Sequence, residues 1–170
     1  MPTEILPVFS IADLSVRFTT PDGAVEAVRG VSLDVGAGET LAIVGESGSG
    51  KSQLVMAAMG LLAGNGRATG SVRYRGAEIL GLKSRDLNRV RGRKITMIFQ
   101  EPMTSLDPLY TIGTQIAEPV RYHQGLGGKQ ARERVLALLR LVQIPDPESR
   151  LSAYPHELSG GQRQRVMIAM

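Results

Sequence analysis

The stretch Thr40-Leu-Ala-Ile-Val44 runs directly into Gly45-Glu-Ser-Gly-Ser-Gly-Lys51-Ser52. The first part is almost wholly apolar, which suits a short strand buried on both faces of a sheet. The second part fits the phosphate-loop pattern G-x-x-x-x-G-K-[ST] completely. From Gly50 to about Leu62, apolar side chains recur on one side of a predicted helix. Strand, glycine-rich loop and helix in this order predict a site for a phosphorylated ligand.

The chemistry of the loop favours ATP with Mg²⁺. Glycines let successive backbone N–H groups point at one centre, and the start of the helix adds positive partial charge. Lys51 can reach the β- and γ-phosphates, and the Ser52 hydroxyl can bind Mg²⁺. The alternative is a glycine-rich turn before a capped helix that binds nothing. The residues assigned to the nucleotide here are Gly45, Glu46, Ser47, Gly48, Ser49, Gly50, Lys51, Ser52 and Gln53.

The hydrophobic pattern predicts mainly strands in the first part of the chain and mainly helices from about Ile112 onward. Segments 11–18 and 25–35 read as β segments around a Pro21-Asp-Gly23 turn, and 71–74 and 95–99 are further strand candidates. From about Ile112 the character is helical, most clearly over 129–143. The order predicts an α/β core with a helical insertion that begins near Thr111.

The amino-acid composition excludes several classes of protein and site. The chain has 170 residues, no cysteine and a net charge of +4, so disulfides and thiolate metal sites are excluded. No apolar run approaches the roughly 20 residues that cross a bilayer. Residues 83–94 are rich in Lys and Arg, which raises nucleic-acid binding as an alternative. Only 4% of residues are aromatic, so a base-stacking surface has little material, and we expect no nucleic-acid partner.

A second helix start is suited to an anion. Leu158-Ser-Gly-Gly-Gln162 places Ser159 as a predicted N-cap, and Gln162 completes an S-x-x-Q capping box. Gly160 and Gly161 leave the first amides uncovered, so an anion could approach closely. Local physics equally allows a well-capped helix with nothing bound.

The segment Leu158-Ser-Gly-Gly-Gln162 resembles the signature motif of ABC transporter ATPases, and 99–108 resembles their Q-loop. Residues 102–108 and the segment Tyr154-Pro-His-Glu extend this resemblance to one subfamily. Because of them, the chain is similar to the ATP-binding subunits of oligopeptide, dipeptide and nickel importers. The resemblance implies an α/β P-loop NTPase core of the ABC type, with N-terminal antiparallel β segments and a helical subdomain. It places the ATP-binding core at 1–110 and the helical subdomain at 111–170.

The resemblance also implies roles. Phe18 matches the aromatic residue that stacks on adenine. Gln100 matches the glutamine that contacts Mg²⁺ or the attacking water, and with Lys51 it is the expected catalytic residue. Ser159, Gly160, Gly161 and Gln162 match the signature positions that contact the γ-phosphate held by the opposite subunit of a head-to-tail dimer.

The expected partners follow from the same resemblance. They are transmembrane permease subunits, a second ATP-binding subunit of the same or a sister chain, and indirectly a solute-binding protein. Glu101–Asp107, with the helical block after it, is expected to dock a cytoplasmic helix of the permease. The subunit is expected at the cytoplasmic face of the plasma (inner) membrane.

The sequence departs from the family at one point. Relatives carry an apolar strand ending in Asp-Glu soon after the signature helix, and here nothing follows Met170. We therefore expect an incomplete copy, truncated after the signature helix begins, that binds nucleotide but has negligible ATP turnover alone. The alternative function is a soluble ABC-superfamily or other P-loop ATPase that is not tied to a transporter.

Overall fold

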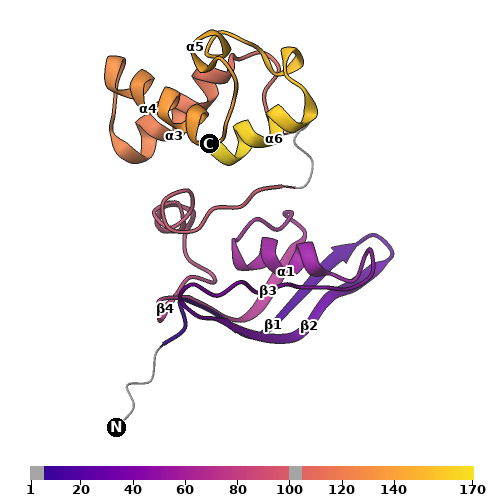
Figure 1. The fold of residues 1–170 in the computed structure, drawn as a ribbon. Coiled ribbons are helices and arrows are strands. Elements are labelled where there is room, and N and C mark those ends of the chain that lie inside the picture. The colour runs from indigo at the N-terminus through magenta and orange to yellow at the C-terminus, as the bar shows by residue number, and fades with distance from the viewer. Residues whose placement is uncertain (1–5, 100–104) are drawn as a thin grey trace. The chain divides into compact units, whose positions relative to one another are not determined.

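The structure is a computed structural model that describes residues 6–99 and 105–170. The chain divides into two compact units, Met1–Arg89 and Val90–Met170, which Figure 1 shows as the strand-rich part and the helical part. Each unit has buried apolar residues of its own. The boundary expected near residue 110 remains a prediction.

The first unit is built on an antiparallel sheet. Its strands are β1 (Phe9–Thr20), β2 (Gly23–Val35), β3 (Gly66–Tyr74) and β4 (Ala77–Glu78), in the order β2-β1-β3-β4. A tight turn joins β1 to β2, with Thr20 opposite Gly23. The predicted β segments at 11–18, 25–35 and 71–74 therefore form, each within a longer strand.

Helix α1 (Lys51–Ala58) packs against this sheet (Figure 1). Leu54, Ala57 and Ala58 are buried on the helix, and Leu14 and Val16 of β1 are fully buried in the sheet. The helix ends earlier than Leu62 because Gly60 adopts φ +62°. The Leu61 and Gly60 amides then donate to the carbonyls of Met56 (2.7 Å) and Ala57 (2.9 Å), which is the Schellman arrangement that closes a helix.

Two strand predictions are wrong. Residues 40–44 and 96–99 form no strand, and Ile95 makes a single bridge to Arg91. Val44 is 87% exposed and Ile98 54% exposed. A strand buried on both faces needs neighbours along its edges for its N–H and C=O groups. Within 6–99 and 105–170, every named strand pairs inside the antiparallel sheet, so these apolar segments have no such neighbour.

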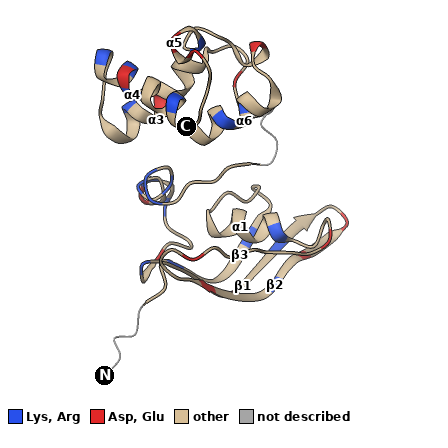
Figure 2. Cartoon of the chain, in the orientation of Figure 1, with Lys and Arg blue, Asp and Glu red and all other residues tan. Residues whose placement is uncertain are grey.

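A short helix, α2 (Ser84–Leu87), follows β4 and begins the basic stretch at 83–94. Lys and Arg lie along this stretch, between β4 and the grey trace in Figure 2. Asp86 is its one acidic residue and forms an exposed 3.5 Å ion pair with Arg89.

The second unit is helical. It contains α3 (Ile112–Gln124), α4 (Gly128–Leu141), α5 (Pro147–Arg150), a 3-10 turn at Pro155–Glu157 and α6 (Gly160–Ala169). Its core includes Ile112, Ile116, Val135, Leu139 and Val166. In the part of the chain that the structure describes, no helix is long and apolar enough to span a membrane.

Candidate functional site

The predicted phosphate loop precedes α1 and turns through left-handed glycines. Gly48 has φ +81°, and Gly50, the N-cap of α1, has φ +93°. These values favour glycine because a Cβ is poorly tolerated there. The Ser49 amide donates to the Glu46 carbonyl at 3.2 Å and the Leu54 amide to the Gly50 carbonyl at 2.9 Å. The loop is therefore a closed turn that leads directly into the first turn of the helix.

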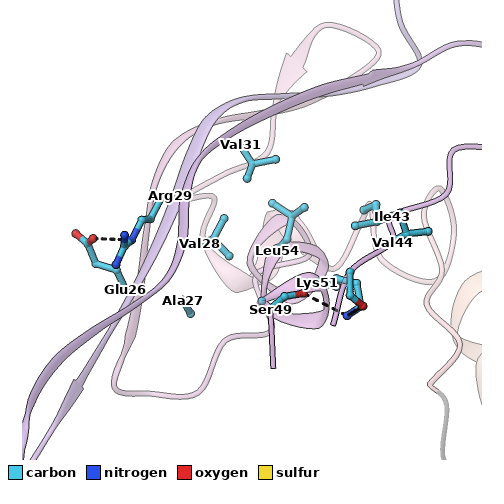
Figure 3. Close-up of a pocket in the computed structure, with 12 residues that line it drawn as sticks. Glu26, Ala27, Val28, Arg29, Val31, Ile43, Val44, Ser49, Lys51 and Leu54 are labelled. Atoms are coloured by element: carbon cyan, nitrogen blue, oxygen red, sulfur yellow. Dashed lines mark hydrogen bonds and ion pairs between the residues drawn. The ribbon is translucent and has the colours of Figure 1, made fainter. Parts of the chain in front are cut away.

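The Lys51 ammonium group lies over this turn. Its Nζ donates to the carbonyl oxygens of Gly45 at 2.8 Å and Glu46 at 2.5 Å, and contacts Ser49 Oγ at 3.3 Å. Figure 3 shows Lys51 and Ser49 side by side at the start of α1. No acidic residue lies in the first turn of α1. The positive helix end and the lysine charge therefore coincide, as an anion site requires.

A cavity of about 520 Å³ adjoins the loop. One wall is β2, and another is formed by Ile43 and Val44 (Figure 3). This volume lies within the range of about 300–1,000 Å³ that holds small molecules and cofactors. The lining residues are Glu26, Ala27, Val28, Arg29, Val31, Ile43, Val44, Gly45, Ser49, Gly50, Lys51 and Leu54.

The β2 residues of this wall were not found from the sequence. Glu26 and Arg29 form an exposed 3.2 Å ion pair beside Ala27 and Val28. Their position depends on the pairing of β2 with β1, in which Val28 lies opposite Val16. No local motif marks them, so only the strand register could have identified them.

Phe18 lies on β1, opposite Val25 of β2 and Gly66 of β3. The ring packs over Gly66, where an added Cβ would come within 2.7 Å of Phe18 Cε1. The side chain is half-buried, and it is not among the residues that line the 520 Å³ cavity. The structure thus places Phe18 in the same unit as the loop, and its role toward adenine stays a prediction.

The predicted capping box at the start of α6 forms. Ser159 Oγ accepts from the Gln162 amide at 3.3 Å, and Gln162 Oε1 accepts from the Ser159 amide at 2.9 Å. Gly160 and Gly161 are exposed, and an added Cβ at either would meet nothing within 4 Å. Arg163 Nε donates to the Pro155 carbonyl at 2.7 Å, which fixes the helix to the preceding 3-10 turn.

The structure brings together the loop residues of the first unit and, separately, the signature residues of the second. Ser52, a predicted Mg²⁺ ligand, is exposed in the first turn of α1. The other predicted ligand, Gln100, lies outside the described residues, as do Glu101–Thr104.

The chain is similar to one protein family and to several individual transport proteins. A family profile described as "ABC transporter" matches residues 28–170. The oligopeptide transport ATP-binding protein OppD of Salmonella typhimurium is 52% identical over 94% of this chain and 48% of its own length. The dipeptide transport ATP-binding protein DppD of Bacillus subtilis is 48% identical over 96% of this chain and 49% of its own. The chain therefore spans about half the length of these curated relatives.

Solved structures show the same fold. The ATP-binding cassette MJ0796, in a dimeric post-hydrolysis state bound to ADP and Pi, matches with a TM-score of 0.81 and 27% identity, over 95% of this chain and 67% of that one. The protein cbiO1 of Clostridium perfringens, described as part of the ABC transporter complex cbiONQ, matches with a TM-score of 0.71 and 25% identity, over 96% of this chain and 60% of its own.

Proposed function

Since the chain belongs to the ABC transporter family, we propose that it is the ATP-binding part of a peptide importer of the OppD and DppD type. The observation that carries the proposal is the Lys51 ammonium group, held over the Gly45–Ser49 turn at the N-terminus of α1. A polyphosphate fits this donor set, because the lysine and the helix amides are all hydrogen-bond donors.

Each loop residue then has a distinct task. In the bound state, Lys51 exchanges its bonds to the Gly45 and Glu46 carbonyls for charge-assisted bonds to the β- and γ-phosphates. The amides of the loop bind the remaining phosphate oxygens. Gly48 and Gly50 allow the backbone to turn around the anion.

The exposed Ser52 hydroxyl at the first turn of α1 is a suitable ligand for Mg²⁺, and Gln100, which lies outside the described residues, is proposed as the second ligand. When bound, Mg²⁺ would add positive charge that neutralises the phosphate oxygens. Ser52 holds its oxygen at the first turn of α1, next to Lys51. Gln100 is also proposed to orient the attacking water and, with Lys51, to serve the hydrolysis reaction.

Two further contacts complete the proposed nucleotide site. Phe18 stacks on adenine from β1. Ser159, Gly160, Gly161 and Gln162 receive the γ-phosphate of a nucleotide bound to a second ATP-binding subunit, through the exposed start of α6. The MJ0796 cassette, a neighbour described as dimeric, supports pairing with a second ATP-binding subunit. The head-to-tail arrangement, with the same chain or a sister chain as partner, is part of the proposal.

The proposed membrane partner is a pair of permease subunits at the cytoplasmic face of the inner membrane, served by a solute-binding protein. The docking segment is Glu101–Asp107. Its described end is fixed to α3, because the Asp107 amide donates to Gln115 Oε1 and the Asp107 carbonyl accepts from Gln115 Nε2, both at 2.9 Å.

The test is cross-linking in an assembled importer. A cysteine at Ser105 should cross-link to a cytoplasmic helix of the permease subunits. A matched cysteine at the exposed Ser149 of α5 serves as the control. Cross-linking at Ser149 with none at Ser105 or its neighbours in the segment would contradict the proposed docking.

A further inference from the structure

A groove of about 480 Å³ lies on the antiparallel sheet of the first unit, with walls from β1, β2 and β3. Glu26, Val28 and Arg29 of β2 line both this groove and the cavity beside the phosphate loop. Figure 3 shows the Glu26 and Arg29 side chains on the side of β2 that faces away from Leu54 and Lys51. The β1 and β3 residues of the groove do not line the loop's cavity, so the two spaces are separate except along this part of β2.

Four side chains of β1 and β3 form a square in this groove. Ser15 lies opposite Thr69, and Arg17 lies opposite Arg67, with no register shift between the two pairs. Directly paired residues, and residues two apart on one strand, point to the same face of a sheet. All four line the groove. The square therefore presents two guanidinium groups and two hydroxyl groups to one space.

The pair of arginines in the square is unfavourable by itself. Like charges directly opposite each other on neighbouring strands destabilise a sheet. On its other side Arg17 lies opposite Glu26, but Glu26 forms its 3.2 Å ion pair with Arg29. In the described ranges 6–99 and 105–170, Arg17 forms no ion pair. An anion between Arg17 and Arg67 would relieve the repulsion.

The square is held in place and keeps donors for a ligand. Arg67 Nη1 donates to the carbonyl oxygens of Gly66 at 3.0 Å and Gly64 at 3.3 Å. Within the part of the chain that the structure describes, Arg67 Nε and Nη2 make no hydrogen bond. Ser15 Oγ accepts from the Gly30 amide at 2.8 Å, which leaves its O–H free to donate.

Two carboxylates, Glu26 and Asp13, also line the groove. Glu26 is already engaged with Arg29. Asp13 lies beyond Ser15 on β1, and its Oδ1 is so close to Gly30 of β2 that a Cβ added there would come within 2.9 Å of it. With three arginines and two carboxylates among its lining residues, the groove has a net charge of +1. The surplus positive charge lies at the arginine pair of the square.

The other acidic residues of the sheet and of the β1–β2 turn lie outside the groove. Asp34 is opposite Ser10 near the end of β2, and Asp22 lies in the turn. Glu78 of β4 accepts from Ser71 and lies 3.6 Å from Arg73. None of these three carboxylates therefore neutralises the square.

We propose that this groove binds the phosphate group of a small phosphorylated molecule, held between Arg17 and Arg67 and by the hydroxyl groups of Ser15 and Thr69. Donors on four sides of one space match the tetrahedral oxygens of a phosphate, whereas a carboxylate has two oxygens in one plane. A volume within the range for small-molecule sites leaves room for the rest of the ligand. The site uses neither the phosphate loop nor a nucleotide, so its test is independent of the proposed function.

The probe is glycerol 3-phosphate, with glycerate as its carboxylate twin and inorganic phosphate as the phosphate group alone. In an NMR titration of the ¹⁵N-labelled chain, glycerol 3-phosphate should shift the amide signals of Ser15 and Thr69, and both twins should bind there more weakly. The affinity read from these signals should be retained in Lys51→Ala, which removes the competing phosphate loop. Arg17→Gln and Arg67→Gln should each weaken it by about twofold to fivefold, because exposed ion pairs are modest.

Two further variants separate binding from folding. Thr69→Val removes a hydroxyl without a change of charge and should also weaken the binding. Arg73→Gln removes an exposed arginine of the same strand outside the groove and should leave the affinity unchanged. Without ligand, Arg17→Gln should unfold at a temperature no lower than that of the wild type, because the repulsion from Arg67 is lost.

Shifts confined to the phosphate loop would overturn the proposal, as would an affinity that Arg17→Gln and Arg67→Gln leave unchanged. Equal affinity for glycerate would contradict the match to a tetrahedral group, and equal affinity for inorganic phosphate would contradict a larger ligand. A lower unfolding temperature for ligand-free Arg17→Gln would show that the arginine pair is not under repulsion, which removes the premise of the site.

Discussion

Gly50 lies against Ala27, so that a Cβ added at Gly50 would come within 2.2 Å of the Ala27 carbonyl oxygen. The contact joins the N-cap of α1 to strand β2, on either side of the phosphate loop's cavity. A glycine is required here twice, once for its φ of +93° and once for the close approach.

Gly50→Ala should therefore disrupt the loop more than Gly48→Ala. Gly48 also has positive φ, but an added Cβ there would meet nothing within 4 Å. Backbone strain alone costs roughly 1–3 kcal/mol, and only Gly50→Ala adds a backbone clash. Chemical denaturation should show a larger loss of unfolding free energy for Gly50→Ala. Equal losses would mean that the approach to Ala27 is unimportant.

The Glu78 carboxylate should make a pH-dependent contribution to the free energy of unfolding. Burial raises the pKa of its carboxyl, but bonds from Ser71 Oγ (2.5 Å), the Val72 amide (2.9 Å) and the Leu80 amide (3.1 Å) outweigh it. With the charge of Arg73, they hold the pKa below its ordinary value of 4.5. The contribution is therefore present above that value and is lost as the pH falls through the folded-state pKa.

Glu78→Gln should remove this contribution of the ionised carboxylate to stability. The difference in unfolding free energy between the wild type and Glu78→Gln should be largest near neutral pH and should shrink below about pH 4.5. Ser71→Ala removes one donor and should reduce the same pH dependence in part. A difference that stays constant across the whole range would contradict the assignment.

The Ser159 N-cap should contribute to the stability of the helical unit. Ser159→Ala removes the side-chain acceptor at the start of α6, and such changes cost about 0.5–2 kcal/mol. Ser159→Gly should cost only a few tenths of a kcal/mol, since glycine is itself acceptable at this position. Thermal unfolding of the two variants provides the comparison, and an equal or larger loss for Ser159→Gly would contradict the cap.

Replacing Phe18 should affect the affinity for ATP and the affinity for tripolyphosphate differently. If the ring stacks on adenine, Phe18→Leu should weaken ATP but leave tripolyphosphate binding unchanged, because tripolyphosphate has no base. Competition titrations with the two ligands measure both affinities on the same protein. An equal loss for both would show that Phe18 supports only the fold around Gly66.

The sequence predicted those features that depend on nearby residues. The β1–β2 hairpin follows from alternation around Pro21-Asp22-Gly23, and the Ser159–Gln162 capping box lies within a single helical turn. Each of these structures supplies its own hydrogen-bond partners. Their residue types therefore identify them without knowledge of the rest of the fold.

The features that the sequence predicted wrongly or did not reveal depend on distant parts of the chain or on a choice between several similar local signals. Residues 40–44 have strand-like composition, but composition supplies no neighbouring strand for their backbone groups. The sequence predicts that α1 runs to about Leu62, whereas the helix closes at Gly60, because several glycines compete as stop signals. The Glu26–Arg29 wall of the cavity depends on strand register, which no motif encodes.

The central claim is that the Lys51 loop binds the phosphates of ATP. Isothermal titration with Mg-ATP tests it on the wild type, on Lys51→Ala and on Lys129→Ala, which removes an exposed lysine of the second unit. Hydrogen bonds to charged groups contribute about 1.5–3 kcal/mol, so Lys51→Ala should raise the Kd by about 10- to 100-fold, while Lys129→Ala should leave it unchanged. An unaltered Kd for folded Lys51→Ala would contradict the account.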